Sequence, residues 1–260
     1  MRSSPFTLID DWRAPAPDPA RVGWLGEWAY AHRGLHGEDV PENSPAAFRA
    51  AMELGLGIEC DVQRAGDGAA IVFHDWEMER LTGASGAVAG LTAKDLAQVR
   101  LGKSEETVPT LGDVLRQIDG KVPLLIEVKS RGDARALALC LEVRRRLEGY
   151  RGKAAVMSFD PRVSRWFRAK APHIVRGLVV TEDGRRTLSA RLKRHLALWH
   201  AKPDFLAYDV RDLPSRFAAA QRARGLPVLT WTVKTADLLS RAGEHADAPI
   251  AEGAGIPSQK

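Results

Sequence analysis

Residues 58–75 limit the fold more than any other part of the sequence, because they place acids inside apolar runs. The Gly-Asp-Gly turn at 66–68 is too short for a parallel crossover, so the stretch predicts an antiparallel hairpin. Glu59 and Asp61 are two residues apart and therefore share one face of the first strand. The return strand brings His74 opposite them. We therefore expect two carboxylates and one imidazole to lie close together.

Apolar residues on both strands of this hairpin predict that both of its faces are buried. Most Glu-x-Asp pairs lie on solvent-facing strands and bind no metal. Buried carboxylates without partners, by contrast, cost several kcal/mol each. The sequence therefore predicts that a cation or a positively charged ligand compensates Glu59 and Asp61.

Strands and helices alternate along most of the chain. Apolar segments predict nine strands, near residues 28, 58, 71, 124, 154, 176, 205, 228 and 249. The strand near 71 is the return of the hairpin, so eight remain as parallel candidates. This alternation predicts an α/β fold, a (β/α)8 TIM barrel with a short insertion after the second barrel strand. A doubly wound open sheet is the alternative, but residues 32–37 lack its Gly-rich phosphate loop.

The length of 260 residues fits one such barrel. We expect residues 1–26, which are rich in Pro and Asp, to form an irregular N-terminal arm, and residues 27–255 to form the barrel. The insertion is expected at about 76–107. Neither a long apolar segment nor a secretory signal is evident, so we expect no stable membrane insertion. Two cysteines make no disulfide framework, which favours a cytoplasmic location.

The formal net charge of +5 is compatible with nucleic acid or with anionic substrates. The densest basic cluster, Arg144–Arg146, lies in a helical pattern and is expected to be a solvated face. Because basic and aromatic residues do not interleave, we expect no nucleic-acid partner. An anionic small molecule remains open, and the sequence does not determine the oligomeric state.

In a barrel, the C-terminal ends of the strands share one mouth. The residues expected there are His32, Arg33, Glu59, Asp61, His74, Glu127, Lys129 and Trp231. The three acids offer oxygen ligands to Mg²⁺ or Ca²⁺, and the lack of a cysteine cluster argues against zinc. Two histidines suit an acid and a base, while Arg33 and Lys129 provide positive charge for an anion. This combination indicates phosphoryl chemistry.

At these positions the chain resembles the glycerophosphodiester phosphodiesterase family, over about residues 29–235. The matching motifs are His32-Arg33-Gly34, Pro41-Glu42-Asn43-Ser44, Ile58-Glu59-x-Asp61-Val62-Gln63, Asp67-Gly68, Val72-x-His74-Asp75, Arg80-x-Thr82, Pro109-Thr110-Leu111, Glu127-x-Lys129, Ser158-Phe159 and Trp231-Thr232-Val233. The resemblance implies a barrel, dependence on a divalent cation, and hydrolysis of a small-molecule glycerophosphodiester to glycerol 3-phosphate and an alcohol.

The resemblance also implies individual roles. It makes His32 and His74 catalytic, makes Arg33 and Lys129 phosphate contacts, and assigns metal binding to the three acids, Glu59, Asp61 and Glu127. Trp231 is either a core residue or a wall against the glycerol group. Glu42 and Asn43 either approach the metal or fix their loop. The remaining histidines are expected to be solvated or at the surface: His36, His173, His195, His200 and His245.

Lys234 departs from the family pattern, which usually has Asn after Trp-Thr-Val, and the loop after the last strand also differs. Lys234 either reaches the rim and disfavours cationic leaving groups, or turns to solvent or pairs with Asp237. Two alternatives to the main function stay open. One is lysophospholipase D or phosphoinositide phospholipase-like activity, and the other is a barrel that binds phosphodiesters without turning them over.

Overall fold

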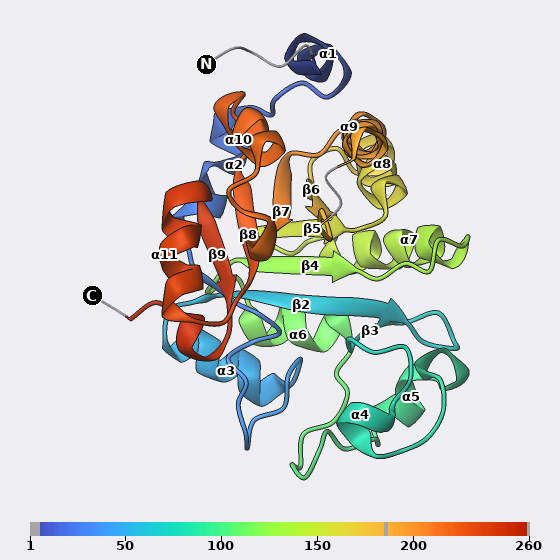
Figure 1. Ribbon diagram of the computed structural model, residues 1–260. Coiled ribbons are helices and arrows are strands. Elements are labelled where there is room, and N and C mark those ends of the chain that lie inside the picture. Colours follow the sequence, from blue (N-terminus) through green and yellow to red (C-terminus); the bar gives the residue numbers. More distant parts are fainter. Residues whose placement is uncertain (1–5, 185–186, 259–260) are drawn as a thin grey trace. The chain divides into compact units, whose positions relative to one another are not determined.

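The computed structural model describes residues 6–184 and 187–258 (Figure 1). It confirms the predicted (β/α)8 barrel fold class, with eight parallel strands that alternate with helices and one antiparallel return strand. No helix in the described ranges is both long enough and apolar enough to cross a bilayer. The chain divides into a first unit, formed mainly by Tyr30–Ala154, and a second unit, formed by Met1–Ala29 with Ala155–Pro257.

The first unit contains the predicted hairpin. β2 pairs with β3 in antiparallel register, Val62 opposite Val72, and with β1 and β4 in parallel register. All residues of β2 except the last are buried, as the apolar pattern predicts. The elements of this unit are β1 (Tyr30–Ala31), α3 (Pro45–Glu53), β2 (Gly57–Arg64), β3 (Ala70–Val72), α4 (Glu79–Thr82), η2 (Val88–Gly90), α5 (Ala93–Leu96), α6 (Leu111–Ile118), β4 (Leu124–Val128) and α7 (Arg135–Leu147).

Local sequence signals explain where two of these helices begin. α3 starts after Ser44, whose hydroxyl accepts the Ala47 N–H at 3.1 Å, and Pro45 occupies the first helical position. α6 starts with a capping box between Thr110 and Asp113.

The predicted insertion at 76–107 contains α4, η2 and α5, which lie beside the hairpin (Figure 1). Its apolar side chains pack in one buried cluster with Ile71 of the return strand and with Phe73, the residue that follows this strand. The cluster also includes Met78, Val88 and Leu96. The hairpin therefore has a packed layer against its second strand, which holds the end of that strand in place.

The second unit contains five parallel strands with consecutive pairing from β5 to β9. Its elements are α1 (Phe6–Arg13), α2 (Pro19–Val22), η1 (Gly23–Glu27), β5 (Ala154–Ser158), α8 (Pro161–Lys170), β6 (Val175–Val180), α9 (Leu188–Ala201), β7 (Phe205–Asp209), η3 (Val210–Asp212), α10 (Arg216–Ala223), β8 (Val228–Val233), α11 (Ala236–His245), β9 (Ala248–Ala251) and η4 (Gly253–Gly255).

The N-terminal segment differs from the prediction. Residues 6–13 and 19–27 are helical, so the expectation of an irregular arm is wrong for most of the segment; residues 1–5 lie outside the described ranges. The carboxylate of Asp10 is buried and accepts hydrogen bonds from Trp199 at 2.7 Å and Gln221 at 2.8 Å. His195 Nδ1 lies 2.9 Å from the same carboxylate. His195 is therefore buried rather than at the surface as predicted, because it forms part of the contact that fixes α1 on α9.

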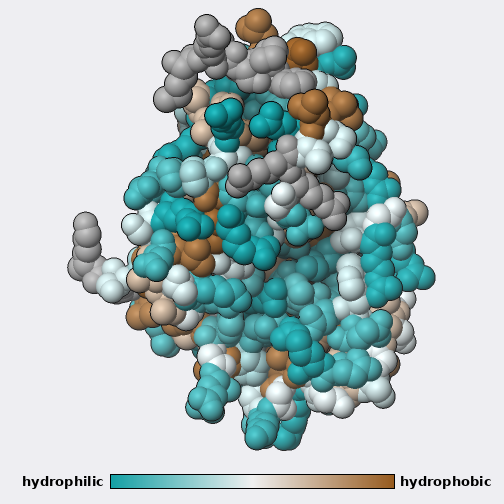
Figure 2. Space-filling view, in the orientation of Figure 1, coloured by the Kyte–Doolittle hydropathy of each residue, from teal (hydrophilic) through white to brown (hydrophobic). Residues whose placement is uncertain are grey.

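The other side of α1 faces outward. Figure 2 shows hydrophobic side chains on the surface at the top of the view, where Figure 1 draws α1 and α9. Leu8 and Trp12 on α1 are 80% and 73% exposed. The short N-terminal helix thus buries a polar residue and exposes apolar ones.

Candidate active site

The loop after β1 begins with a tight backbone turn. Arg33 and Asn43 both have left-handed backbone conformations, with φ of 55° and 56°, and the Asn43 N–H donates to the Arg33 carbonyl at 2.8 Å. Gly34 also has positive φ, and a Cβ added there would lie 2.8 Å from the Cβ of Ala47. Only glycine fits this turn without displacing α3. The turn directs the Arg33 N–H to Glu59 Oε2, at 3.0 Å.

Three acids meet in the first unit. Glu59 and Asp61 lie on β2, and Glu127 lies on β4 directly across from Asp61 in the parallel register. Each offers a carboxylate oxygen, and these three oxygens lie within 4.8 Å of one another. Glu59 and Asp61 are 2% exposed. The structure therefore brings together the three residues that the sequence predicted as metal ligands.

Two cations of the protein itself contact these acids. Lys129 Nζ lies 3.3 Å from Asp61 Oδ1 and 3.1 Å from Glu127 Oε1, and Arg33 Nε lies 3.1 Å from Asp61 Oδ2. Side chains of the protein therefore provide part of the positive charge that the sequence predicted for a bound cation or ligand. Both cations contact Asp61, so the compensation is uneven.

The pKa values reflect this uneven compensation. Burial acts to raise the pKa of Asp61, but Lys129 and Arg33 hold it below its ordinary value. Burial and the neighbouring carboxylates raise the pKa of Glu59 well above its ordinary value, and burial is also the main reason why the pKa of Glu127 is raised. With all three acids ionised, the site would carry more negative charge than Arg33 and Lys129 neutralise.

A hard divalent cation fits this group. Three carboxylates face two cations, which leaves a negative charge, and all the candidate donors are oxygens. Oxygen donors are those that Mg²⁺ and Ca²⁺ prefer. The raised pKa of Glu59 points the same way, since a cation near it would favour its charged form.

Asn43 and Glu42 hold charged residues of the site in position. The buried Asn43 amide donates to Asp61 Oδ2 at 3.0 Å and accepts the Asp61 N–H at 3.2 Å. Glu42 accepts from Arg33 at 2.8 Å and from Arg80 at 2.6 Å. Burial acts to raise the pKa of Glu42, but Arg80 and Arg33 lower it, so Glu42 is a stable anion in this position.

His74 follows β3, and the observed register places it beside the acids, as predicted. Its Nδ1 lies 2.7 Å from Asp75 Oδ1, and its charge contributes to lowering the pKa of Asp61. Gln63 donates to the carbonyls of Phe73 at 2.9 Å and Asp75 at 2.6 Å, which fixes the chain on both sides of His74.

A chain of ion pairs links the two ends of the site. It runs from Arg33 to Glu42, from Glu42 to Arg80, and from Arg80 to Asp75, which contacts His74. Asp75 and Arg80 both occur in the motifs shared with the family, but the sequence predicts no role for either. Arg80 lies on α4, and its partners Glu42 and Asp75 are on other segments of the chain.

His32 directly follows β1 and is half-buried, next to Arg33. A cavity of about 130 Å³ adjoins Lys129. Trp76, Ala87 and Ala89 from the predicted insertion line one part of it. The guanidinium of Arg131 stacks over the Trp76 ring at 4.6 Å. The insertion therefore contributes to the space beside one of the predicted phosphate contacts.

Trp231 and Lys234 belong to the second unit. Trp231 is half-buried on β8; its indole N–H donates to the Ala207 carbonyl at 2.9 Å, and its ring meets that of Phe159 edge-to-face at 5.4 Å. Lys234 follows β8, is 59% exposed, and lies 2.7 Å from Glu252. Its partner is thus Glu252 from the atypical final loop, and pairing with Asp237 was the wrong alternative.

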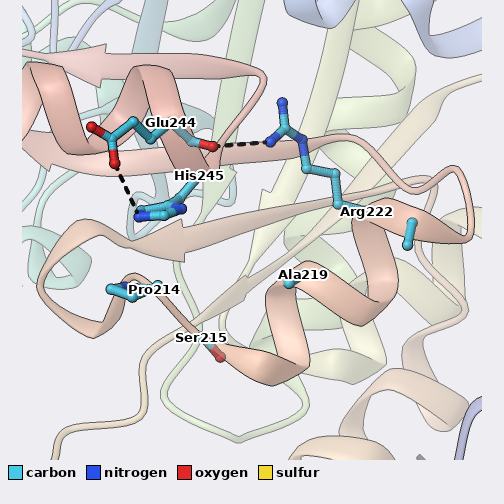
Figure 3. Close-up of a pocket in the computed structure, with 7 residues that line it drawn as sticks. Pro214, Ser215, Ala219, Arg222, Glu244 and His245 are labelled. Carbon is cyan, nitrogen blue, oxygen red and sulfur yellow. Dashed lines mark hydrogen bonds and ion pairs between the residues drawn. The ribbon is translucent and has the colours of Figure 1, made fainter. Parts of the chain in front are cut away.

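A separate cavity of about 320 Å³ lies in the second unit (Figure 3). Glu244 approaches His245 Nε2 at 3.5 Å, and its carbonyl accepts from Arg222 at 3.5 Å. The lining also includes Pro214, Ser215 and Ala219. Glu244 is the one acid among these lining residues, so the cavity lacks the acid grouping of the first unit. We assign it no catalytic role.

The chain is similar to several known proteins. The model of the glycerophosphoryl diester phosphodiesterase family matches residues 32–249. A Mycobacterium tuberculosis protein named probable glycerophosphodiester phosphodiesterase 2 is 30% identical over 89% of this chain and 88% of its own length. A Caldanaerobacter subterraneus glycerophosphodiester phosphodiesterase is 34% identical over 57% of this chain and 65% of its own length.

A solved structure supports the fold. An Oleispira antarctica phosphodiesterase, in complex with the product sn-glycerol-3-phosphate, superimposes with a TM-score of 0.75. The match covers 86% of this chain and 92% of that chain, at 24% identity. At this identity, the likeness shows the barrel fold alone.

Proposed function

Because the chain belongs to the glycerophosphoryl diester phosphodiesterase family, we propose that it hydrolyses a glycerophosphodiester to glycerol 3-phosphate and an alcohol. One observation carries the proposal: a single unit holds three clustered carboxylates, two cations that contact them, and a histidine oriented by an aspartate. Binding of a phosphodiester alone would not need the His74–Asp75 contact. The geometry therefore favours an enzyme over a binding barrel.

The metal would be held by Glu59, Asp61 and Glu127. When bound, Mg²⁺ or Ca²⁺ would polarise the phosphoryl oxygens and offset charge that develops on them. Asn43 would hold Asp61 in position, because its hydrogen bonds fix both the carboxylate and the backbone N–H of Asp61. It is therefore a positioning residue in this proposal.

Arg33 and Lys129 would bind the phosphate. A guanidinium has five N–H donors and an ammonium has three. The ion pairs of Arg33 engage Nε and Nη1, and those of Lys129 engage two carboxylates, so both groups can still donate to a ligand. Because both are held by acids before the substrate arrives, little reorganisation would accompany binding.

The two histidines would transfer the protons. With Nδ1 of His74 donating to Asp75, its Nε2 would carry the lone pair needed by a base. One histidine would take a proton from the attacking oxygen as the new P–O bond forms. The other would protonate the leaving alkoxide as the old P–O bond breaks. The attacking oxygen is either water or the neighbouring glycerol hydroxyl, which would pass through a cyclic phosphate.

Other parts of the proposal rest on the sequence. We propose that Trp231 forms a wall against the glycerol group and that Lys234 influences the choice of leaving group. We also propose an N-terminal segment at 1–26, a barrel at 27–255 and an insertion within it at about 76–107. Both cysteines are buried and free, which fits the cytoplasmic location that we propose.

The test is a substrate panel assayed for release of glycerol 3-phosphate. It comprises glycerophosphocholine, glycerophosphoethanolamine, glycerophosphoinositol and a lysophospholipid, each with Mg²⁺, with Ca²⁺ and with a chelator. We expect release from the small diesters, and loss of activity on chelation and in Glu127→Gln. Arg145→Gln, an exposed change on α7, is the control. Preferred release of a phosphorylated lipid would support the phospholipase-like alternative, and binding without release would support the binding barrel.

A further inference from the structure

Large hydrophobic side chains are concentrated on two outer helices of the second unit. Among the described residues, six of the ten exposed ones lie on α1 and α9: Leu8, Ile9, Trp12, Leu188, Leu192 and Leu196. The three leucines of α9 are four residues apart, so they form one stripe along the helix. They are 80%, 45% and 50% exposed. Clustered exposed apolar side chains of this kind mark interaction surfaces.

The two helices form one surface, which we call the α1–α9 face. The buried Asp10 joins them through its contacts with His195 and Trp199. Hydrophobic side chains gather on the molecular surface at this place (Figure 2). The polar contacts lie between the helices, so the leucines and Trp12 are left on the outside.

The α1–α9 face is also cationic. α8 packs against α9, and neither helix contains Asp or Glu. Partial burial and the nearby Arg168, Arg165 and Arg13 lower the pKa of Lys202, so these three arginines add positive charge around Lys202 at the end of α9. The exposed acid of α1, Asp11, is paired with Arg224.

Trp12 adds a feature typical of interfaces. Its ring is 73% exposed, and the Arg13 guanidinium stacks on it at 4.3 Å. An indole has an apolar body and a polar N–H, which suits the boundary between lipid chains and headgroups. Arginine beside it would remain in contact with headgroup phosphates.

We propose that the α1–α9 face docks on the surface of an anionic lipid bilayer. The leucine stripe and Trp12 enter the headgroup boundary, and the cations of α1, α8 and the end of α9 contact anionic lipids. A second copy of the chain fits less well, because a two-fold contact would place this cationic cluster against itself. Single-stranded nucleic acid fits less well too, because most of the exposed groups are leucines rather than the aromatic rings on which bases stack.

The experiment is sedimentation of the full chain with phosphatidylcholine vesicles, with and without phosphatidylglycerol. We expect binding to the anionic vesicles that weakens at high salt. Arg165→Gln/Arg168→Gln should lower the partition coefficient about 30-fold, from roughly tenfold per 1.4 kcal/mol and about 1 kcal/mol per cation. Leu192→Ser/Leu196→Ser should lower it by at least about tenfold, since two leucines lose their burial in the bilayer.

The matched control is Leu137→Ser/Leu141→Ser on α7, two leucines with the same spacing that are 38% and 37% exposed. It should bind like the wild type. Absence of binding to anionic vesicles would overturn the proposal, and so would equal binding to neutral ones. A dimer that Leu192→Ser/Leu196→Ser converts to a monomer, without vesicle binding, would assign the face to a second copy instead. Melting curves of all variants check that each is folded.

Discussion

Glu59 and Asp61 lie two residues apart on β2, yet the pKa of one is raised and that of the other is lowered. We predict that Glu59→Gln stabilises the metal-free protein, whereas Asp61→Asn destabilises it. The glutamine retains an oxygen for the Arg33 N–H, which now donates to Glu59 at 3.0 Å. The two substitutions therefore differ mainly in which electrostatic interactions they remove.

The magnitudes follow from the distances. At 4.8 Å and an effective dielectric of about 20, two carboxylates repel each other by about 3.5 kcal/mol. Glu59→Gln removes two such repulsions, about 7 kcal/mol together, and an attraction to Arg33 of at most about 5 kcal/mol, so we expect a net gain of at least about 2 kcal/mol. Asp61→Asn also removes two repulsions, but it loses two attractions of about 5 kcal/mol each, to Lys129 at 3.3 Å and Arg33 at 3.1 Å. We expect a net loss of about 3 kcal/mol, which matches the cost of breaking a buried ion pair.

The pH dependence has opposite signs as well. The pKa of Glu59 in the folded protein is raised above its ordinary value of 4.5. Below pH 4.5 the side chain is protonated in both the folded and the unfolded state, so it costs no stability. As the pH rises from there through the folded-state pKa, Glu59 increasingly destabilises the fold. The advantage of Glu59→Gln should therefore grow toward alkaline pH. Because the pKa of Asp61 is lowered, its stabilisation is present above 3.8 and is lost as the pH falls through the folded-state pKa.

The assay is thermal unfolding with a chelator across this pH range, with Glu38→Gln as an exposed control. Each kcal/mol should shift Tm by about 2–4 °C in a chain of this size. Adding Mg²⁺ or Ca²⁺ should raise Tm of the wild type by mass action, and much less in either variant. If Glu59→Gln lowers Tm of the metal-free protein at alkaline pH, or if both variants shift the same way, the reasoning about crowded charge is wrong.

Three further predictions concern turnover. His32→Ala and His74→Ala should each lose about 10²–10⁴ in kcat/KM with an unchanged melting curve, and full activity in either would remove that residue from the mechanism. Asp75→Asn should lower kcat and shift a limb of the bell-shaped pH profile, because it alters the partner of His74 Nδ1; a uniform loss at every pH would contradict this. Lys234→Asn removes the Lys234–Glu252 ion pair and one positive charge, so the kcat/KM ratio of glycerophosphocholine to bis-glycerophosphate should rise by up to about fivefold at low salt, given the exposure of Lys234. A ratio that stays constant would show that Lys234 has no part in specificity.

Sequence reasoning located the acids and His74 because a hairpin with a short turn has a fixed register. Glu127 lies across from Asp61 because β4 pairs with β2. The register of the hairpin does not reveal that pairing. Apolar segments also predicted the nine strands. These features depend on neighbours along the chain, so they are visible in one sequence.

The features that were missed depend on distant partners. Asp10 meets His195 and Gln221, which are 185 and 211 positions away, so nothing near Asp10 indicated a buried residue. Arg80 likewise contacts Glu42, which is 38 positions away in the sequence. Ion-pair partners depend on side-chain directions that periodicity does not specify, and this is why Glu252 was not among the alternatives for Lys234.

The chain of ion pairs from Arg33 to His74 has a consequence for how such enzymes can vary. Its middle link, Arg80, lies in the predicted insertion, and it contacts both Glu42 and Asp75. An insertion of another length or composition would leave two acids beside the site without their shared cation. Positions 42, 75 and 80 should therefore covary among relatives. Transplanting the insertion between relatives should succeed only when the donor supplies an arginine or the recipient has lost both acids.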